Sequence, residues 1–432
     1  MPDRTLMVLL NGVCVGELTQ DAMGRIRFSY DMAVRGWLPR ATPLSLSLTP
    51  DVESHEGPEV AAFLWGLLPE NPAVLSRWAR EFGVSAANPV ALLRHVGMDC
   101  AGAVQFVPLN DYERVLDAGG VEWLDDDAIA QVVRGLHHDS AAWHPGHEEG
   151  QFSLAGVQAK VALLREGGKW GRTWGRIPTT HIIKPAIPDL IDQDVNEHLC
   201  LAAARAVGLT AARTEIRTFG DQTAVVVERY DRARVDDVWA RVHQEDLCQS
   251  LGIHPVQKYQ SEGGPGPEDV AALFRRVQPS IEAQESVRAF VDALVFNWLL
   301  AGTDGHAKNY SVLLSGGQVR LAPLYDISSA LPYPDVMNPH KIKLAMKIGR
   351  EYRLKSIGWS SWRRLAERLD LDCDEVWGRI DELARALPDA LSDVAATPEV
   401  RYLRRSLPGA LVDAAAARVA ELLRLPRAAA QG

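Results

Sequence analysis

The sequence feature that most limits how this chain can fold is an apolar helix that runs directly into a charged loop. In "SVRAFVDALVFNWLLAG" (residues 286–302), apolar side chains cover much of the helix, as expected of an element buried in a core, and Gly302 is a predicted stop. The next stretch, "TDGHAKN" (303–309), contains an acid, an imidazole, an amine and an amide. Because a buried helix delivers this loop to the edge of a core, the stretch predicts a chemical site.

Asp304 and Asn309 have the D-x-x-x-x-N spacing of the protein-kinase catalytic loop. In that loop the acid accepts the proton of the attacking hydroxyl, and the amide oxygen binds a magnesium ion that bridges the phosphates. Downstream, an alternating strand in "QVRLAPLYDISSAL" (318–331) leads to Tyr325 and Asp326. One or two carboxylates with phosphate oxygens and water usually hold Mg²⁺. Singly, these residues are better interpreted as turn formers and caps; together they favour a phosphoryl-transfer site.

A possible nucleotide site lies upstream of this loop. Lys184 ends the predicted strand "TTHIIKPAI", and Glu197 lies in the helix that follows, as in kinases where such a pair orients ATP. A solvated strand end and a carboxylate that favours a helix N-terminus explain the two residues equally well. In "GQFSLAGVQAKVALL", Gly156 lies in a small-residue turn before a strand near Lys160. That turn could aim N–H groups at phosphates or be an ordinary hairpin entry, and it is not a Walker A loop.

Composition and charge narrow the class of protein. The 432 residues are 47% apolar and 24% charged, which predicts a globular chain of two or three domains. With 46 basic and 56 acidic residues, the net charge of −10 argues against nucleic-acid binding by this chain alone and favours a basic partner protein. No apolar run is long enough to cross a bilayer, and "MPDRTLMVLLNG" lacks the form of a signal peptide, so we expect a cytoplasmic protein with no membrane partner. The five cysteines are scattered without a CxxC pair, which argues against a disulfide framework and a zinc ribbon.

Periodicity predicts a β-rich start and a helical end. The first 50 residues read as a meander with an Asn11-Gly12 turn and a further alternating stretch at 44–49. Two helices broken at "PENP", then a helix and a strand, follow to residue 108, and the polar stretch 135–150 reads as a loop or domain joint. Strands on either side of one helix, 192–209, then indicate a small α+β lobe, and the chain beyond residue 234 reads as largely helical.

Eight motifs in order resemble the HipA family, the toxin kinases of HipA/HipB toxin–antitoxin systems. They are "FSLAGVQAK", "PTTHIIKPAI", "DVNEHLCLAAARAVGL", "VVVERYDR", "VHQEDLCQSLGI", "KYQSEGGPG", "NWLLAGTDGHAKNYSVLL" and "LYDISSALP". The resemblance extends to "GLLPENPAVLSRWAREFGV" and "VGMDCAGAVQFVP" and weakens after about residue 350. It implies an α+β, protein-kinase-like two-lobe fold with a β-rich N-terminal subdomain (1–140), a small lobe (141–234) and a mainly helical C-terminal lobe (235–432).

The resemblance also implies an activity and partners. It points to the toxin of a type II toxin–antitoxin system, a serine/threonine protein kinase that uses ATP and Mg²⁺. Family members phosphorylate aminoacyl-tRNA synthetases, glutamyl-tRNA synthetase above all, so translation arrest and persistence are the expected outcome. A HipB-like DNA-binding antitoxin would restrain the kinase, and DNA would be reached only through that antitoxin.

The resemblance assigns roles to residues by their place in the motifs. Asp304 is the implied catalytic base, Lys184 contacts the phosphates, Asn309 and Asp326 hold magnesium, and Ser153 is the implied site of self-inhibiting autophosphorylation. The negative charge of a phosphate on Ser153 would favour departure of the adjoining phosphate loop from the site. Further positions implied to contact the nucleotide are Ala155, Gly156, Val157, Gln158, Ala159, Lys160, Glu228, Arg229, Tyr230 (228–230 as the adenine-facing hinge), Gln244, His306, Ala307, Lys308 and Tyr325. The best-studied members carry alanine and glutamate where this chain has Val157 and Ala159, and the metal-binding acid stands in "YDIS" in place of "DFG".

Other functional classes share part of this chemistry. A small-molecule phosphotransferase of the aminoglycoside-kinase type would use Asp304, Asn309 and Asp326 without needing the N-terminal 130 residues. A hydrolase that uses a metal with Asp304, His306 and Asp326, and a scaffold that only binds an antitoxin, are lower-ranked alternatives. An H-x-x-H spacing occurs in a group that chance explains better than metal binding: His137, His138, His144 and His147.

Overall fold

The chain folds into two compact units, each assembled from separate parts of the sequence. The computed structural model describes residues 5–37, 40–112, 119–139, 141, 152–338 and 341–424. Unit 1 comprises residues 1–185, 218–256 and 311–320, and unit 2 comprises 186–217, 257–310 and 321–432. Because the chain passes several times between the units, neither is a continuous stretch. The division into three domains, with boundaries expected after residues 140 and 234, stays a prediction.

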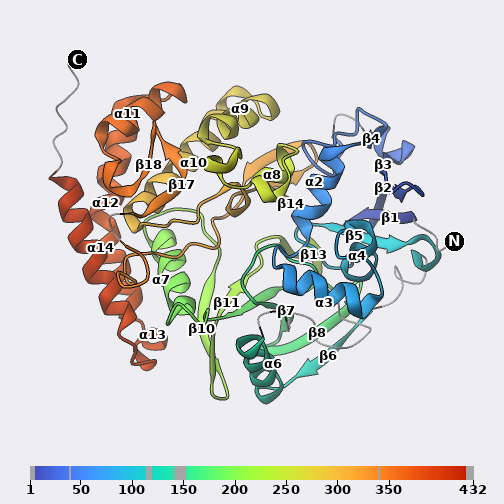
Figure 1. Ribbon diagram of the computed structural model, residues 1–432, viewed down its shortest axis with the longest axis horizontal. Coiled ribbons are helices and arrows are strands. Elements are labelled where there is room, and N and C mark those ends of the chain that lie inside the picture. The colour runs from blue at the N-terminus through green and yellow to red at the C-terminus, as the bar shows by residue number, and fades with distance from the viewer. Residues whose placement is uncertain are drawn as a thin grey trace. The chain divides into compact units, whose positions relative to one another are not determined.

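A five-stranded antiparallel sheet begins unit 1 (Figure 1). Its spatial order is β4-β3-β2-β1-β5. The strands are β1 (Thr5–Leu10), β2 (Val13–Gln20), β3 (Ile26–Tyr30), β4 (Ser54–Glu56) and β5 (Val104–Pro108). Asn11 and Gly12 connect β1 to β2 with φ values of 48° and 79°, as a tight hairpin requires. The expected meander is thus confirmed.

The alternating stretch 44–49 is not a strand, so that expectation is wrong. Its β-type pairing is limited to an isolated bridge between Ser45 and Leu48. The hydroxyls of Ser45 and Ser47 donate to the Gln249 carbonyl at 3.2 and 2.8 Å. The serines anchor the segment to another part of unit 1, and Leu44 and Leu48 are buried, so the alternation comes from these contacts and not from a β-ladder.

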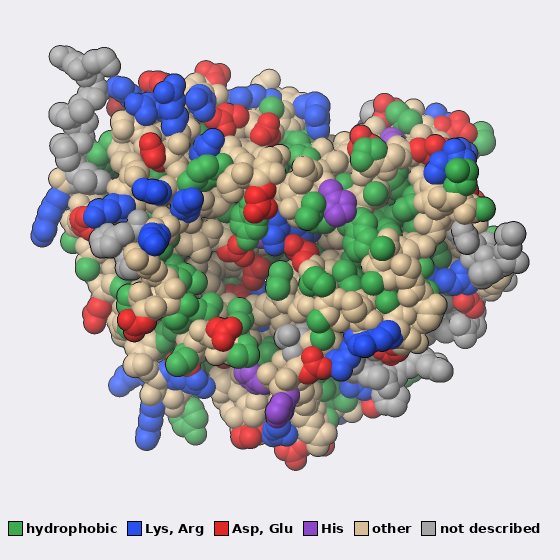
Figure 2. Space-filling view, viewed as in Figure 1, with side chains coloured by type: hydrophobic (Ala, Val, Ile, Leu, Met, Phe, Trp, Pro, Cys, Tyr) green, Lys and Arg blue, Asp and Glu red, His purple; other side chains and the backbone are tan. Residues whose placement is uncertain are grey.

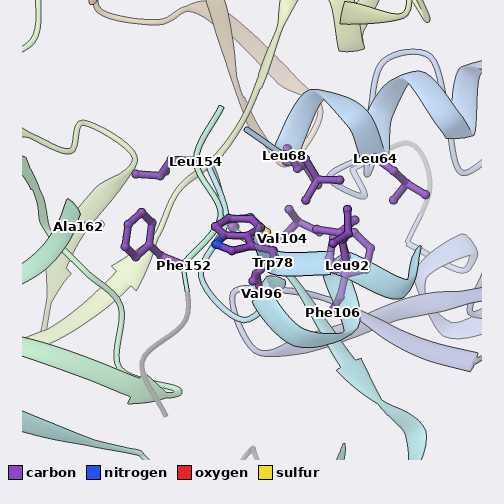
Figure 3. Close-up of a cluster of buried hydrophobic side chains, with 14 of the residues drawn as sticks. Leu64, Leu68, Trp78, Leu92, Val96, Val104, Phe106, Phe152, Leu154 and Ala162 are labelled. Atoms are coloured by element: carbon purple, nitrogen blue, oxygen red, sulfur yellow. The ribbon is translucent and has the colours of Figure 1, made fainter. Parts of the chain in front are cut away.

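Short helices cover the first sheet and share a core with it. They are α1 (Met32–Arg35), α2 (Pro58–Leu67), α3 (Pro72–Phe82) and α4 (Pro89–Val96). The last three begin with proline, whose fixed φ suits the first helical position, and confirm the helices expected there. Figure 3 shows Trp78 of α3 in the resulting cluster of buried side chains with Phe106 of β5. The same cluster contains Phe152 and Leu154, which come from a distant part of the chain.

A second sheet has the order β10-β11-β9-β7-β8-β6. Its strands are β6 (Gly119–Leu124), β7 (Val161–Glu166), β8 (Lys169–Gly175), β9 (His181–Pro185), β10 (Thr214–Phe219) and β11 (Gln222–Glu228). Helix α6 (Asp126–His138) extends into the stretch expected to be a loop, so that expectation is wrong for 135–138. Leu136 holds this last turn because it is only 2% exposed. His144 and His147 lie outside the described residues.

Several short strands were missed in the part expected to be largely helical. They are β12 (Arg232–Val235), β13 (Val238–Arg241), β14 (His243–Asp246), β15 (Ser311–Ser315), β17 (Lys343–Ile348) and β18 (Glu351–Arg353). A further strand, β16 (Gln318–Leu321), is the alternating strand that the sequence predicted. The alternating strand expected to run on to Tyr325 ends at Leu321. Pro323 has no N–H for a ladder, and beyond it Leu324 makes only an isolated bridge with Ala211.

Helices form most of unit 2, as expected for the C-terminal part. They are α7 (Gln193–Ala206), α9 (Pro267–Val277), α10 (Ser280–Leu300), α11 (Trp359–Arg368), α12 (Cys373–Ala395), α13 (Pro398–Tyr402) and α14 (Leu407–Leu423), while the four-residue α8 (Leu247–Ser250) belongs to unit 1. In the core of unit 2, Trp298 of α10 meets Trp362 of α11 edge to face with ring centroids 5.5 Å apart. Among the described helices, none combines the length and apolar character needed to span a membrane.

Candidate active site

The loop that contains Asp304 begins where the buried helix α10 ends. Ala301 takes the left-handed conformation, with φ of 53°, and the Gly302 N–H donates to the Asn297 carbonyl at 2.7 Å. The expected stop is therefore reached one residue before Gly302. Glycine is required at 302 for space, because a Cβ there would lie 2.1 Å from Asn297 Oδ1.

Asn297 fixes the loop from inside α10. Its Nδ2 donates to the Tyr310 hydroxyl at 3.0 Å and to the Ala293 carbonyl at 3.2 Å. Tyr310 follows the loop directly, so one buried amide connects the residues on either side of it. Sequence reasoning did not assign this role, and its signal was a single asparagine within "ALVFNWLL".

The Asp304 carboxylate is oriented but accessible. The Tyr259 hydroxyl donates to Asp304 Oδ1 at 2.7 Å, and His306 Nε2 lies 3.8 Å from the same oxygen. The Tyr259 and His306 rings meet edge to face with centroids 4.9 Å apart. Because the Asp304 side chain is 61% exposed, a hydroxyl from outside can reach it. Tyr259 is a second residue to which the sequence assigned no role.

The same loop sets the orientation of the Asn309 side-chain amide. Its Nδ2 donates to the main-chain carbonyl of Asp304 at 2.8 Å, and its N–H donates to the His306 carbonyl at 2.9 Å. A single 3₁₀ turn, Ala307–Asn309, carries it. With Nδ2 committed, the amide presents Oδ1 as its acceptor, which is the atom a magnesium ion would require.

Asp326 is brought to this loop by its neighbour and is held in a costly backbone conformation. The Tyr325 hydroxyl donates to the Lys308 carbonyl at 2.6 Å, which connects the residue before Asp326 with the residue before Asn309. Asp326 has φ of 56°, a left-handed conformation that typically costs a non-glycine residue about 1–3 kcal/mol. Such strain persists only where the surroundings hold the segment in place.

Helix α7 provides that hold. The Asn196 side chain donates to the Ser329 carbonyl at 2.8 Å and accepts from the Ser329 N–H at 2.9 Å. This two-way amide contact anchors the segment just after Asp326. Asn196 is a third positioning residue without an assignment from sequence.

The donor set at this loop fits a magnesium ion. Asn309 Oδ1 and the Asp326 carboxylate are hard oxygen ligands, and Mg²⁺ takes few protein ligands because it keeps water and phosphate oxygens. Within the described ranges, no group of three or more His, Cys, Asp or Glu side chains could hold a metal ion. A magnesium ion held by Asn309 and Asp326 would therefore need phosphate oxygens and water as its other ligands.

The predicted phosphate loop, 155–160, lies in unit 1 and is closed on itself. Lys160 Nζ donates to the Ala155 carbonyl at 2.6 Å, and Gln158 Nε2 donates to the Pro185 carbonyl at 2.9 Å. Gly156 has φ of 109°, and a Cβ there would lie 2.6 Å from Lys160 Nζ. The positive φ favours glycine at this position, and a Cβ would also displace the Lys160 ammonium from its place in the loop.

Lys184 belongs to β9 and faces Val225 of β11 in the ladder. It is 7% exposed. Glu197, its expected partner, is a buried residue of α7 and belongs to unit 2. The predicted ion pair stays a prediction.

The predicted hinge follows β11. Glu228 ends the strand with an exposed side chain, while the guanidinium of Arg229 is buried and ion-paired within unit 1. The Tyr230 hydroxyl hydrogen-bonds Gln244 Oε1. The Arg229 side chain is thus committed to the interior, whereas the exposed Glu228 side chain and main-chain groups of 228–230 could still contact an adenine.

Ser153 is fully buried. Its hydroxyl donates to the Leu67 carbonyl at 2.8 Å, and its N–H donates to the Asp99 carbonyl at 3.0 Å. Figure 3 shows its neighbours Phe152 and Leu154 in the apolar cluster of unit 1. A phosphoryl group could reach the Ser153 hydroxyl only after this segment leaves the core.

Two family models match this chain. The model described as HipA-like C-terminal domain matches residues 152–391, and the HipA N-terminal domain matches residues 6–107. A putative kinase of Sinorhizobium fredii is 37% identical over 91% of this chain and 92% of that protein. The serine/threonine-protein kinase toxin HipA of Shewanella oneidensis is 28% identical over 90% of this chain and 89% of its own length.

A solved structure resembles this chain over nearly its whole length. It is the Shewanella oneidensis HipA in complex with HipB and operator DNA. The match has a TM-score of 0.82 at 25% sequence identity and covers 97% of both chains. The expected α+β, kinase-like fold is confirmed.

Proposed function

This chain belongs to the HipA family, and from that premise we propose that it is a toxin kinase that transfers the γ-phosphoryl group of Mg·ATP to a serine or threonine hydroxyl of a protein. The observation that carries the proposal is the Asp304 loop. There an accessible carboxylate, held by Tyr259, lies in the same short loop as the Asn309 amide, whose Nδ2 is bonded to the Asp304 carbonyl and whose Oδ1 is left as the acceptor. This combination is what phosphoryl transfer to a hydroxyl requires.

In the proposed reaction, Asp304 accepts the proton of the substrate hydroxyl. The hydroxyl oxygen then forms a bond to the γ-phosphorus while the bond to the β,γ-bridging oxygen breaks and ADP departs. Asn309 and Asp326 would hold the magnesium ion, which supplies neutralisation of the phosphate charge. Because little covalent chemistry is left to the protein, its contribution is to orient the two reactants.

Most of the proposed nucleotide contacts belong to unit 1. The loop 155–160 offers main-chain N–H groups to the phosphates, Lys184 offers its ammonium, and the main chain of 228–230 faces the adenine. Gln244, hydrogen-bonded to Tyr230, is the polar side chain beside that hinge. His306, Ala307, Lys308 and Tyr325 complete the proposed nucleotide contacts, from the catalytic loop and from the segment that follows β16.

We propose that autophosphorylation of Ser153 inhibits the kinase. Burial of the Ser153 hydroxyl supports a switch with two discrete states, since a phosphate of about −1.5 to −2 charge could not return to an apolar site. The phosphorylated segment would stay outside, and the adjoining loop 155–160 would lose the anchor from which it cradles phosphates.

The proposed cellular role is translation arrest in the cytoplasm under the control of a HipB-like antitoxin. The substrate would be an aminoacyl-tRNA synthetase, with glutamyl-tRNA synthetase as the first candidate. Figure 2 shows Lys and Arg side chains over the part of unit 2 that Figure 1 labels α11 to α14, yet the whole chain carries −10. DNA affinity is therefore expected to come from the antitoxin.

The test is transfer of labelled phosphate from ATP in a cell extract. Wild-type protein should label itself and one or a few extract proteins, with purified glutamyl-tRNA synthetase as a defined substrate. Ser153→Ala should lose self-labelling and keep transfer to the substrate, whereas Asp304→Asn should lose both. Label that appears only in low-mass hydroxyl compounds would instead identify a small-molecule phosphotransferase.

A further inference from the structure

A buried ionic cluster in unit 1 has no part in the reaction described so far. Its charged members each have 7% or less of their surface exposed and are Asp99, Arg229, Asp231, Arg232 and Arg241. Asp99 contacts all three arginines, with nitrogen–oxygen distances of 3.3 Å to Arg229, 2.9 Å to Arg232 and 3.3 Å to Arg241. It also accepts a hydrogen bond of 2.5 Å from the Thr179 hydroxyl.

The cluster is charged in the folded protein. Burial opposes ionisation of Asp99, but the three guanidinium groups outweigh it and hold the pKa of this carboxyl below its ordinary value. Asp231 bridges Arg229 at 2.8 Å and Arg232 at 3.0 Å. A buried pair of this kind adds little stability compared with apolar packing, but removing one partner is strongly destabilising. Its value to a fold is the fixed geometry that it imposes.

The cluster fixes the positions of the segments beside the proposed hinge. Thr179 lies just before β9, the strand of Lys184, and Arg229 lies just after β11. These segments also meet directly, since the Arg229 N–H donates to the Thr180 carbonyl at 2.9 Å and Arg229 Nη1 donates to the Thr179 hydroxyl at 2.9 Å.

The anchor for both segments comes from the N-terminal part of the chain. Asp99 lies between α4 and β5, and Gly102 of the same turn donates its N–H to Asp231 at 2.6 Å. Arg232 in turn donates to the Gly102 carbonyl at 2.9 Å. The turn 99–102 is therefore locked by contacts in both directions to residues 231–232, which directly follow the hinge.

We propose that Asp99 is a positioning residue for nucleotide binding, through which the N-terminal subdomain sets the spacing between the start of β9 and the hinge. This inference rests on the proposed function, because it assumes that 228–230 faces the adenine. Asp99 is buried and is not among the residues proposed to contact substrate or nucleotide. It acts through Thr179, Arg229 and Arg232, whose positions determine where the main chain of the hinge lies.

The test needs a variant that folds. Asp99→Asn alone would leave three buried guanidiniums with one carboxylate, so the cluster charge would rise from +1 (three positive, two negative) to +2. Adding Arg241→Met restores it to +1 (two positive, one negative), and Arg241→Met alone is the matched control that keeps Asp99 with its other contacts. Thr179→Val is a milder variant that removes the hydroxyl between Asp99 and Arg229.

The measurements are calorimetric titration with MgATP and steady-state phosphorylation of one protein substrate. For Asp99→Asn/Arg241→Met we expect Kd and KM for ATP to rise about ten-fold relative to Arg241→Met, with kcat at saturating ATP within about two-fold. Thr179→Val should raise both by about three-fold. A lesion that only destabilises the fold would lower the amount of active enzyme and leave KM unchanged.

Two results would overturn the inference. One is ATP affinity within two-fold between the double variant and Arg241→Met, and the other is a fall in kcat with an unchanged KM. If wild-type protein itself binds no MgATP, the proposed function fails first and the inference fails with it. Binding of MgATP by wild type without transfer to protein would reject the kinase activity, and the affinities of the variants would still decide the role of Asp99.

Discussion

Replacing Phe152 with alanine tests how the Ser153 segment is held. Phe152 is 4% exposed and belongs to the apolar cluster that contains Trp78 (Figure 3). Truncating a core phenylalanine to alanine typically costs about 3–5 kcal/mol. Because Phe152 adjoins Ser153, the cost falls on the docked state of the segment and is absent once the segment has left the core. A loss of about 3 kcal/mol shifts the opening equilibrium by about 100-fold.

The expected result is faster self-phosphorylation of Phe152→Ala at Ser153, by up to about 100-fold until the chemical step becomes limiting. Label incorporation in a single turnover measures the rate, and hydrogen exchange of the Ser153 amide, which is bonded to the Asp99 carbonyl, measures the opening. Phe28→Ala is the control, since Phe28 is fully buried in the same cluster but lies on β3. Equal acceleration by both variants, or an unchanged rate in Phe152→Ala despite faster exchange, would refute the reasoning.

Three further perturbations follow from the site and its surroundings. Gly302→Ala should lower the free energy of unfolding, measured in urea, by about 1–3 kcal/mol, because the new Cβ would lie 2.1 Å from Oδ1 of the hydrogen-bonded Asn297 side chain. Gly378→Ala in α12 is the control: a Cβ there meets nothing within 4 Å, so this variant should be more stable by about 0.5–1 kcal/mol. Tyr259→Phe removes the hydrogen bond to the exposed Asp304 carboxylate. It should lower kcat by about five-fold without changing KM for ATP. An unchanged kcat would show that the tyrosine does not orient the base. Burial raises the pKa of Glu245 from 4.5 to about 7, so the stability contributed by its protonated form is complete below pH 4.5 and is lost as the pH rises to about 7. Wild-type protein should therefore lose about 3 kcal/mol of unfolding free energy between pH 4.5 and 7, and Glu245→Gln should not show this loss. The same pH dependence of unfolding in both proteins would contradict the raised pKa of Glu245.

Much of the local structure was predictable because it depends on short-range signals. The Asn11-Gly12 turn and the prolines at the starts of α2, α3 and α4 act through backbone conformation within a few residues. The D-x-x-x-x-N loop was recognisable for the same reason, since Asp304 and Asn309 bond within one loop.

The errors arose where contacts distant in sequence decide the structure. The stretch 44–49 alternates like a strand, but its serines bond to Gln249, about 200 positions away. The short strands β14 and β15 carry weak periodicity, and they form because they pair across about 65 intervening residues.

The positioning residues were missed for a related reason. Asn196, Tyr259 and Asn297 act through one or two side-chain hydrogen bonds to segments that the sequence does not show as neighbours. The sequence assigned Asp99 no role of its own, because nothing in "VGMDCAGAVQFVP" indicates arginines more than 100 residues away. Such residues become visible only when the fold brings the segments together.

The most direct test of the account separates binding from transfer at Asp304. MgATP binding and single-turnover transfer of labelled phosphate to a protein substrate are measured side by side on wild type and Asp304→Asn. The account predicts an ATP Kd within about two-fold of wild type and transfer reduced by about 1,000-fold or more, because the variant keeps the nucleotide contacts and loses the group that accepts the hydroxyl proton. Transfer by Asp304→Asn at more than a tenth of the wild-type rate would contradict the assignment of Asp304 as the base on which the proposed kinase chemistry depends.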